Sequence, residues 1–473
     1  SDILWSPDSS QSCEMQQFMK YVNDEHELNF DTYEQLYNWS INFGSDFWAS
    51  IWKYTNIIHS DPYDEVVDDI NRMPGAKWFS GSRLNFAENL LRYKDDQLAI
   101  QFKGEGQPVR SLTYKELYNE VEILASALRN AGLQEGDRVA GFLPNLPEAI
   151  IAMLATASIG AIWSASSPDF GIKGVLDRFS QIKPKFLFAA NGYFYNGKPF
   201  DSLEKLRGIL KDLPSVEKVI LVPYTNNDFD ISNISHAVYY EDFVDRNNYG
   251  SLVLDQLPFN HPLYIMYSSG TTGLPKSIVH SAGGTLIHYL KELKLHVDLG
   301  RDDTIFYFTT CGWMMWNWLV SSLATGATVV LYDGSPLHPD TSAMWKLAQD
   351  FKISIFGTSA KFITASEAAG ERPKQKFDLS KLRSILSTGS ALVEEGFEYV
   401  YRDVKDDVLL ASISGGTDLI SCFALGNPTL PVHRGELQCR GLGMAVESFD
   451  TNGQKQLNQK GELVCTLAFP SMP

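Results

Sequence analysis

The chain has 473 residues, 44% of them hydrophobic and 21% charged, which is the composition of a globular protein and excludes a largely disordered one. Its net charge of −17 argues against nucleic acid or an anionic membrane as the main partner, because either would require a basic face. Two uncharged stretches, residues 149–168 and 304–332, are interrupted by glycine and polar residues, so we expect no membrane span. Five scattered cysteines without metal-ligand spacing, and no signal-like segment among the first residues, predict a cytoplasmic protein with free thiols.

The first 80 residues are rich in tryptophan and tyrosine, and their apolar residues recur at helix-like spacing. This section contains no motif that points to chemistry of its own. We therefore interpret residues 1–80 as an N-terminal cap that packs on the core.

From residue 112 the chain alternates helix-like and strand-like segments. The apolar residues from Leu117 to Leu128 are spaced four, three and four apart, which predicts one face of an amphipathic helix ending at Gly132. Further helices are expected to begin at Pro147 and to span residues 175–181. The predicted strands are residues 138–143, 160–164, 186–190, 218–222, 263–267, 305–308, 327–332, 353–356, 383–387 and 408–413.

Strands separated by helices predict an α/β fold of parallel-rich sheets with helices on their faces. Because roughly ten such strands are too many for one ordinary sheet, we expect two stacked α/β subdomains. The expected division is residues 81–258 for the first subdomain and 259–430 for the second, followed by the start of a smaller β subdomain at 431–473.

The segment Tyr267 to Lys276 reads YSSGTTGLPK and follows an apolar run, and we predict that it binds phosphate. Its glycines allow the backbone to turn sharply and to bring N–H groups close to an anion, while Lys276 adds a positive charge. A Walker A loop is excluded, because Pro275 stands where that motif requires its second glycine. The alternative is a surface turn that binds no ligand. The expected placement of the segment between a strand and a helix at 283–293 favours the phosphate-binding interpretation. The predicted donors are Ser268, Ser269, Gly270, Thr271, Thr272, Gly273 and Lys276.

This segment resembles the phosphate-binding signature of the adenylate-forming enzymes, the superfamily of acyl-CoA synthetases, peptide-synthetase adenylation domains and luciferases. Other segments match the same pattern in the same order, so that the resemblance covers nearly the whole chain and is strongest to members that activate acetoacetate. The matching segments are residues 78–85, 136–140 with 147–148 and 159–161, 310–316, 387–391, 415–418 and 461–463.

The resemblance implies a ligase that joins an acid to AMP with release of pyrophosphate and then transfers the acyl group to the thiol of CoA. ATP, Mg²⁺ and CoA would be the cofactors, and acetoacetate the acid. The implied phosphate ligands are Thr271, Thr272 and Lys276 for the β- and γ-phosphates and Thr417 for the α-phosphate, with Asp418 for the metal. The implied nucleotide contacts are Ser268, Ser269, Gly270, Gly273, Gly389, Ser390, Ala391 and Gly416, and the implied acid contacts are Trp313, Met314, Met315 and Gly415.

Two positions depart from the wider pattern. Most members carry Glu where this chain has Asp418, a shorter side chain that favours a water-bridged metal. Acetyl-CoA synthetases carry a tryptophan where this chain has Gly415, and its absence predicts a pocket deeper than acetate needs.

Several of these residues also have purely structural interpretations. Thr417 and Asp418 could cap the N-terminus of a helix, Gly389 could be a turn glycine, and the Trp and Met residues from 313 to 316 could be core packing. His280 and His288 have no predicted partner and are interpreted as structural.

The family's mobile C-terminal domain, with its hinge and a catalytic lysine, has no counterpart up to Pro473, so we expect a truncated chain that is inactive in full turnover. Two alternatives stay open: a synthetase for another short or medium-chain acid, and a nucleotide- or acyl-binding fragment without turnover.

Overall fold

The computed structural model describes residues 2–8, 10–269 and 273–473, and its centre is a pair of seven-stranded sheets. The first sheet has the order β13-β12-β9-β7-β8-β15-β16, and the second has the order β21-β20-β19-β17-β18-β5-β6. Strands pair in parallel in both sheets except at one edge of each, where a hairpin adds an antiparallel strand. The predicted α/β class with two parallel-rich sheets is confirmed.

In the first sheet the strands are β7 (Arg138–Phe142), β8 (Ile162–Ser166), β9 (Phe186–Ala190), β12 (Lys218–Val222), β13 (Ala237–Tyr239), β15 (Pro262–Ser268) and β16 (Lys276–Ser281). The second sheet consists of β5 (Leu98–Gly104), β6 (Arg110–Thr113), β17 (Thr304–Tyr307), β18 (Thr328–Asp333), β19 (Ile355–Ser359), β20 (Ser384–Thr388) and β21 (Leu409–Ser412). Each predicted strand therefore exists to within a few residues. Sequence reasoning missed β5, β6, β13 and β16.

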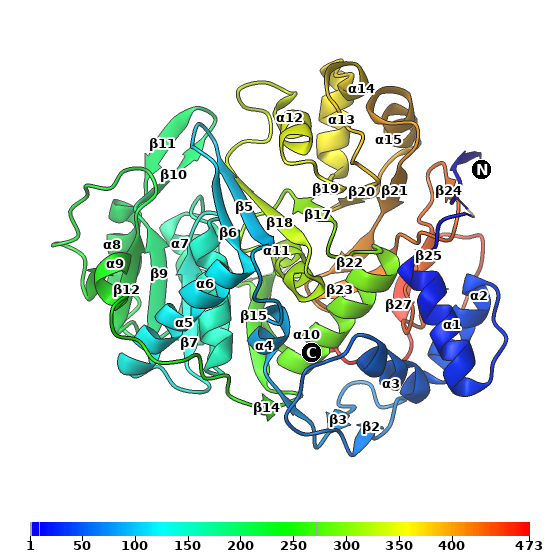
Figure 1. Ribbon diagram of the computed structural model, residues 1–473, viewed down its shortest axis with the longest axis horizontal. Helices are drawn as coiled ribbons and strands as arrows, with labels where there is room; N and C mark the ends of the chain where they lie inside the picture. The colour runs from blue at the N-terminus through cyan, green and yellow to red at the C-terminus, as the bar shows by residue number, and fades with distance from the viewer. Residues whose placement is uncertain (1, 9, 270–272) are drawn as a thin grey trace.

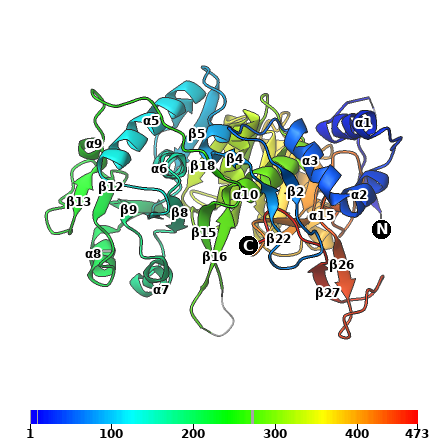
Figure 2. The ribbon, with the colours of Figure 1, turned by 90° about the horizontal axis from the view of Figure 1, so that it is seen from below.

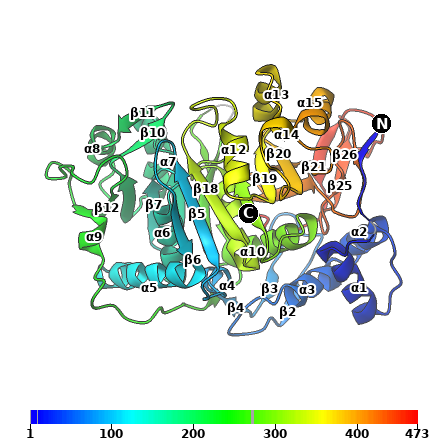
Figure 3. The same ribbon diagram turned by 45° about the horizontal axis from the view of Figure 1, so that its top comes forward.

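Helices lie against the faces of both sheets (Figures 1 and 3). Beside the first sheet lie α5 (Tyr114–Asn130), α6 (Pro147–Ser158), α7 (Ile172–Ile182), α8 (Leu203–Lys211) and α9 (Tyr240–Phe243). Later helices are α10 (Ala282–Leu290), α11 (Met314–Val320), α12 (Ala343–Asp350), α13 (Ala360–Ala368), α14 (Pro373–Lys376) and α15 (Glu394–Tyr399). Three of them continue in another helical form: α10 as the π-helix η1 (Lys291–His296), α11 as the 3₁₀-helix η2 (Ser321–Thr325) and α15 as the π-helix η3 (Val400–Val404).

Local sequence explains where α5 begins. The Thr113 hydroxyl accepts a hydrogen bond from the Glu116 N–H, and the Glu116 carboxylate accepts one from the Thr113 N–H. This capping box satisfies two backbone donors that the first turn of a helix leaves unpaired. The apolar face predicted from Leu117 to Leu128 is buried.

The two sheets do not divide the chain near residue 258 as expected, because each sheet takes strands from both sides of that point. Strands β5 and β6 precede the first sheet in sequence but pair with β18 of the second sheet (Figure 3). The hairpin β15–β16 follows that division but pairs with β8 of the first sheet. A hairpin that completes the edge of a parallel sheet needs no crossover helix, so strand–helix alternation in the sequence does not reveal it.

The N-terminal section forms β1 (Ile3–Trp5), α1 (Glu14–His26), α2 (Tyr33–Asn42), α3 (Gly44–Tyr54), β2 (Glu65–Val67), β3 (Trp78–Ser80), β4 (Arg83–Leu84) and α4 (Phe86–Leu90). Its helices lie beside the C-terminal strands (Figure 1), where Tyr33 Oη donates to the Arg440 carbonyl at 2.6 Å and Tyr37 Oη to that of Met444 at 2.8 Å. Aromatic side chains such as Trp48 and Trp52 are buried against the main body.

The remaining strands are short: β10 (Gly192–Tyr195), β11 (Lys198–Asp201), β14 (Leu257–Pro258), β22 (Ser414–Gly416), β23 (Ser421–Leu425), β24 (Val432–His433), β25 (Cys439–Arg440), β26 (Val446–Phe449) and β27 (Glu462–Cys465). Within the described part of the chain, no helix has the length and apolarity needed to cross a bilayer.

Candidate active site

Two parts of the chain, residues 313–315 and segments within 388–422, meet around a cavity of about 80 Å³. Strand β20, helix α11 and the pair β22–β23 supply its walls. Its lining contains most of the residues that the sequence assigned to the acid and to the loop near the α-phosphate. We call this cavity the acid pocket; its lining residues are Trp313, Met314, Met315, Thr388, Gly389, Ile413, Gly415, Gly416, Thr417 and Cys422.

Helix α11 begins at the floor of the acid pocket. Trp313 is its N-cap, in extended conformation, and Met314 and Met315 form its buried first turn. Trp316, by contrast, is fully buried and donates its indole N–H to Asn145 Oδ1 at 3.0 Å. The core-packing interpretation therefore holds for Trp316, while the two methionines are both buried and pocket-lining.

The turn after β20 needs glycine. Gly389 has a φ of +91°, a backbone conformation that side chains rarely adopt, and it lies at the carboxyl end of the strand. Just before it, Thr388 Oγ1 donates to the Ile413 carbonyl at 3.0 Å, which ties this turn to the strand leading into β22. Ser390 and Ala391 follow on the exposed side of the turn.

Strands β22 and β23 approach so closely that Gly415 has no room for a side chain. A Cβ there would lie 2.3 Å from the Ser421 carbonyl oxygen and 2.8 Å from Cys422 Cα. At Gly416 the nearest atom would be Leu419 Cδ2 at 3.9 Å, which is ordinary contact. Glycine at position 415 is therefore required by the packing of β22 against β23.

Thr417 and Asp418 lie in the turn between β22 and β23. Since a strand and not a helix follows, the helix-cap interpretation of these two residues is wrong. The Thr417 carbonyl accepts a hydrogen bond from His280 Nε2 at 2.7 Å. Asp418 is exposed at the same turn.

His280 connects this turn to the strand that carries Lys276. It is buried in β16, and burial lowers its pKa to about 4, so the ring is neutral at neutral pH with a proton on Nε2. Because alternate residues of a strand share a face, Lys276 and His280 project from the same side of β16, roughly 13 Å apart along the strand. Sequence reasoning missed this role, although the four-residue spacing to Lys276 within a strand was the available signal.

The phosphate segment connects β15 to β16, and the expected helix at 283–293 follows that strand as α10 and η1. Ser268 and Lys276 are paired across this hairpin, Ser269 and Gly273 are exposed, and Gly270, Thr271 and Thr272 lie outside the described residues. Figure 2 shows that β15 and β16 project on the same face of the molecule as the β26–β27 hairpin. Sequence reasoning missed β16, the six residues of strand between the phosphate segment and α10.

The residues present suit a magnesium ion that is held mainly by a phosphate ligand. Among the described residues, no group of three or more His, Cys, Asp or Glu side chains could hold a metal. Mg²⁺ bound to nucleotides commonly uses only one or two carboxylates together with phosphate oxygens and water. The exposed carboxylate of Asp418, next to Thr417, fits that pattern.

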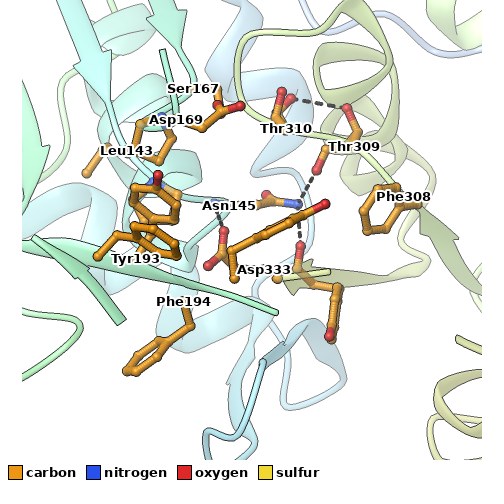
Figure 4. A pocket seen from close by; sticks show the side chains of 16 residues that line it. Leu143, Asn145, Ser167, Asp169, Tyr193, Phe194, Phe308, Thr309, Thr310 and Asp333 are labelled. Carbon is orange, nitrogen blue, oxygen red and sulfur yellow. Dashed lines mark hydrogen bonds between the residues drawn. The ribbon is translucent and has the colours of Figure 1, made fainter. Parts of the chain in front are cut away.

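A second, larger pocket of about 300 Å³ lies where the carboxyl ends of strands from both sheets meet (Figure 4). This aromatic pocket is lined on one side by Tyr193, Phe194, Tyr195 and Phe200 of the β10–β11 hairpin, and on the other by Asp333 at the end of β18. Burial raises the pKa of Asp333 to about 7, and its Oδ1 accepts from the Asn145 N–H at 3.3 Å. Thr309 and Thr310 belong to its lining, so the loop leading to Trp313 separates it from the acid pocket.

Sequence reasoning did not find the aromatic pocket. Of its residues, only Thr310 belonged to a recognised motif. The available signal was general: ligands of α/β proteins bind at the carboxyl ends of the parallel strands, and Leu143 to Asn145 and Asp333 stand at such ends.

Comparison with known protein families gives two matches along the chain. The AMP-binding enzyme family matches residues 86–466, and the N-terminal segment of acetyl-coenzyme A synthetases matches residues 33–90.

Individual relatives match the whole chain. An acetoacetyl-CoA synthetase from Gallus gallus is 50% identical over 100% of this chain and 72% of its own length, and one from Rhizobium meliloti (strain 1021) is 48% identical over 99% and 72%. The malonamoyl-CoA synthetase vrtB of Penicillium aethiopicum is 41% identical over 98% of this chain and 68% of its own. The solved structure of acetoacetyl-CoA synthetase from Streptomyces lividans superimposes with a TM-score of 0.95 at 41% identity, covering 100% of this chain and 74% of that one.

Proposed function

The chain belongs to the family of AMP-binding enzymes, and from that premise we propose that its acid pocket activates acetoacetate as an acyl-adenylate for transfer to CoA. A carboxylate is too poor an electrophile for a thiol to attack directly. In adenylation a carboxylate oxygen attacks the α-phosphorus of ATP, so that an O–P bond forms while the bond to pyrophosphate breaks. The CoA thiol then attacks the carbonyl carbon of the acyl-adenylate, and AMP leaves with the bridging oxygen.

The size of the acid pocket is the observation that carries the choice of acid. At about 80 Å³ it is far smaller than the roughly 300–1,000 Å³ of sites that hold drug-sized ligands, which favours an acid of few atoms. Methionines 314 and 315 provide apolar surface for its carbon chain. Acetyl-CoA synthetases place a tryptophan where Gly415 stands, so this pocket has room beyond the two carbons of acetate.

The relatives also favour an acid with a second carbonyl. Acetoacetyl and malonamoyl groups share the same skeleton, a carbonyl two carbons from the acyl carbon, and differ in a methyl against an amino group. A ketone buried without a donor would cost about 1–3 kcal/mol, so a donor in the lining is needed to favour it over an alkyl chain. The candidate donors among the lining side chains are the Thr417 hydroxyl, the Trp313 indole N–H and the Cys422 thiol.

The residues around ATP act by position and charge. Thr417, held through its carbonyl by His280, is proposed to contact the α-phosphate, and Lys276 to reach the β- and γ-phosphates from the same face of β16. Preorganised donors of this kind stabilise the charge that develops on the phosphates during attack. Mg²⁺ would neutralise part of that charge when bound, and Asp418 is the carboxylate placed to hold it. Gly389, Ser390 and Ala391 are proposed to lie along adenine.

We infer that the aromatic pocket takes the nucleotide end of CoA. The pocket borders the acid pocket through the loop from Thr309 to Trp313, so a flexible ligand seated there has a short path to the activated carbonyl. Its aromatic side chains suit the stacking of an adenine ring, which contributes about 1–3 kcal/mol per base in other proteins.

The reaction is tested by its products. The full-length protein with ATP, Mg²⁺, CoA and acetoacetate should yield acetoacetyl-CoA and AMP in equal amounts, together with pyrophosphate, and no ADP. Formation of ADP and phosphate would contradict adenylation. Binding of ATP and acid without any pyrophosphate release would favour the alternative of a binding module.

A further inference from the structure

A short π-helix buries a cluster of ionisable side chains behind the acid pocket. It is η1, the continuation of α10, and its first two residues, Lys291 and Glu292, are both completely buried. π-Helices are rare and occur frequently at functional sites. Burying a charge is costly unless it is paired and hydrogen-bonded, so this cluster calls for a reason beyond packing.

The carboxylate of Glu292 accepts one hydrogen bond from each of two walls of the acid pocket. The backbone N–H of Cys422, which lines the pocket from β23, donates to Oε1 at 2.9 Å. The indole N–H of Trp318 donates to Oε2 at 2.9 Å. Trp318 lies on α11 four residues after Met314, on the same face of that helix. Glu292 therefore connects the strand and the helix whose separation sets the width of the pocket.

The surrounding groups compensate the charge of Glu292 and fix its place. Lys291 Nζ lies 3.9 Å from Glu292 Oε1 and donates to the Leu442 carbonyl at 3.0 Å. His296 Nδ1 donates to the Gly426 carbonyl at 2.9 Å, and its Nε2 accepts from the Leu442 N–H at 3.3 Å. These bonds connect η1 to Gly426 and Leu442, which lie before and after β25. They fix the position of Glu292 relative to the pocket walls.

We propose that Glu292 is a positioning residue that sets the distance between β23 and α11 and thereby determines which acids the pocket accepts. The proposal deepens the proposed function and rests on it only in assigning this cavity to the acid. Glu292 does not line the cavity itself, so it acts through Cys422 and through the helix that carries Met314 and Met315.

The chemistry requires a carboxylate at this position. Two oxygens can accept from two donors at once, whereas an amide offers one acceptor and one donor group. In Glu292→Gln the amide NH₂ would face either the Cys422 N–H or the Trp318 indole, and that wall would be released. Trp318→Phe would release α11 alone and leave the bond to β23 intact.

The test measures acid-dependent ATP–pyrophosphate exchange for acetoacetate and for butyrate, a four-carbon acid that lacks the ketone. We expect Glu292→Gln to raise the KM for the preferred acid about tenfold, to reduce the preference for it over the other acid about fivefold, and to leave the KM for ATP within about twofold. Trp318→Phe should change the preference in the same direction by a smaller factor.

The matched control is Glu371→Gln, because Glu371 is a buried carboxylate that accepts hydrogen bonds from Thr341, Ser342 and Lys376, none of which lines the acid pocket. A merely structural role for Glu292 would lower thermal stability and the rates for both acids equally, as in this control. An unchanged acid preference in both Glu292→Gln and Trp318→Phe would overturn the proposal, and Trp318→Phe alone decides if Glu292→Gln does not fold.

Failure of the proposed function gives a different result. If the unsubstituted protein prefers an acid other than acetoacetate, the assignment of acetoacetate fails. The ratio between that acid and its nearest competitor then tests Glu292 in the same way.

Discussion

Lys276 and His280 lie on one face of β16, and we propose that they serve different parts of a bound triphosphate, His280 through Thr417 and Lys276 directly. His280 is neutral, buried and bonded to the Thr417 carbonyl, whereas Lys276 is exposed at the start of the strand on the same face. A triphosphate with its α-phosphate at Thr417 would extend toward Lys276. This arrangement assigns the lysine to the outer phosphates.

Lys276→Ala should therefore slow adenylation on the order of 10²-fold, the loss seen when one preorganised donor to a developing charge is removed. The measurement is acetoacetate-dependent pyrophosphate release. Lys20→Ala, which removes an exposed lysine from α1, should leave the rate unchanged. A Lys276→Ala protein with the original rate would rule out the phosphate assignment.

The methionines of α11 offer a direct test of pocket size. Met314→Ala should enlarge the acid pocket and shift preference by about tenfold toward acids two or three carbons longer than acetoacetate, since about 0.8 kcal/mol is gained per buried CH₂. Met344→Ala removes an equally buried methionine from α12 and should lower stability without changing acid preference. The comparison is made by exchange rates over a series of straight-chain acids. Equal effects of the two substitutions would show that Met314 belongs to the core alone.

Gly415 is less suitable for such a test. Any side chain there would collide with the backbone of β23, so Gly415→Trp would push two strands apart as well as fill the pocket. Loss of acetoacetate turnover in that variant would not distinguish the two effects. The spacing of β22 and β23 gives a reason for glycine at this position that the sequence alone did not reveal.

The β10–β11 hairpin forms one wall of the aromatic pocket (Figure 4). Tyr193→Ala should raise the KM for CoA about tenfold, because adenine stacking contributes about 1–3 kcal/mol. Acetoacetate-dependent pyrophosphate exchange, which needs no CoA, should be unaffected in the same protein.

Tyr249→Ala is the control for that variant, because Tyr249 is an exposed tyrosine that bonds Asn119 away from the pocket. It should change neither half-reaction. A Tyr193→Ala protein that loses both half-reactions equally would place the hairpin in the fold rather than in the CoA site.

The elements differ in how far their sequences reveal them. Strands such as β9 and β12, which are buried runs between helices, and helices such as α5, with its cap and apolar face, follow from local patterns. The hairpins β5–β6 and β15–β16 do not, because antiparallel edge strands need only a short connection and change the sheet to which a segment belongs. The π-helix η1 is also invisible in sequence, since Lys291 and Glu292 read as a solvated face until their burial is known.

The candidate site divides in the same way. Motif residues such as Trp313, Gly389, Gly416 and Thr417 are brought to one cavity, as their order along the chain led us to expect. The residues that hold them, His280 and Glu292, carry no motif, because their roles depend on contacts between segments more than a hundred residues apart.

At the scale of the whole molecule, buried neutral histidines make the fold sensitive to acid. Burial lowers the pKa of His296 to about 3, whereas a histidine in the unfolded chain titrates near 6.5. The unfolded state therefore takes up the proton first as the pH falls, and the stability contribution is lost between about pH 6.5 and pH 3.

Between pH 7 and pH 5, His296 should account for about 2 kcal/mol of the loss in the free energy of unfolding. Glutamine can keep a donor toward the Gly426 carbonyl and an acceptor toward the Leu442 N–H, so His296→Gln should fold and should lose less stability over that range by this amount. Denaturant unfolding at the two pH values measures the difference. An unchanged dependence in His296→Gln would show that this histidine does not titrate as its burial requires.

We propose that the molecule selects a small acid with a second carbonyl, and the ratio of two exchange rates measures this selection. Acetoacetate and butyrate have the same number of carbons, so a pocket that measures size alone should treat them alike. We expect kcat/KM for acetoacetate-dependent ATP–pyrophosphate exchange to be about tenfold or more above that for butyrate-dependent exchange. This factor corresponds to one hydrogen bond to the ketone. Equal rates, or a preference for butyrate, would contradict it.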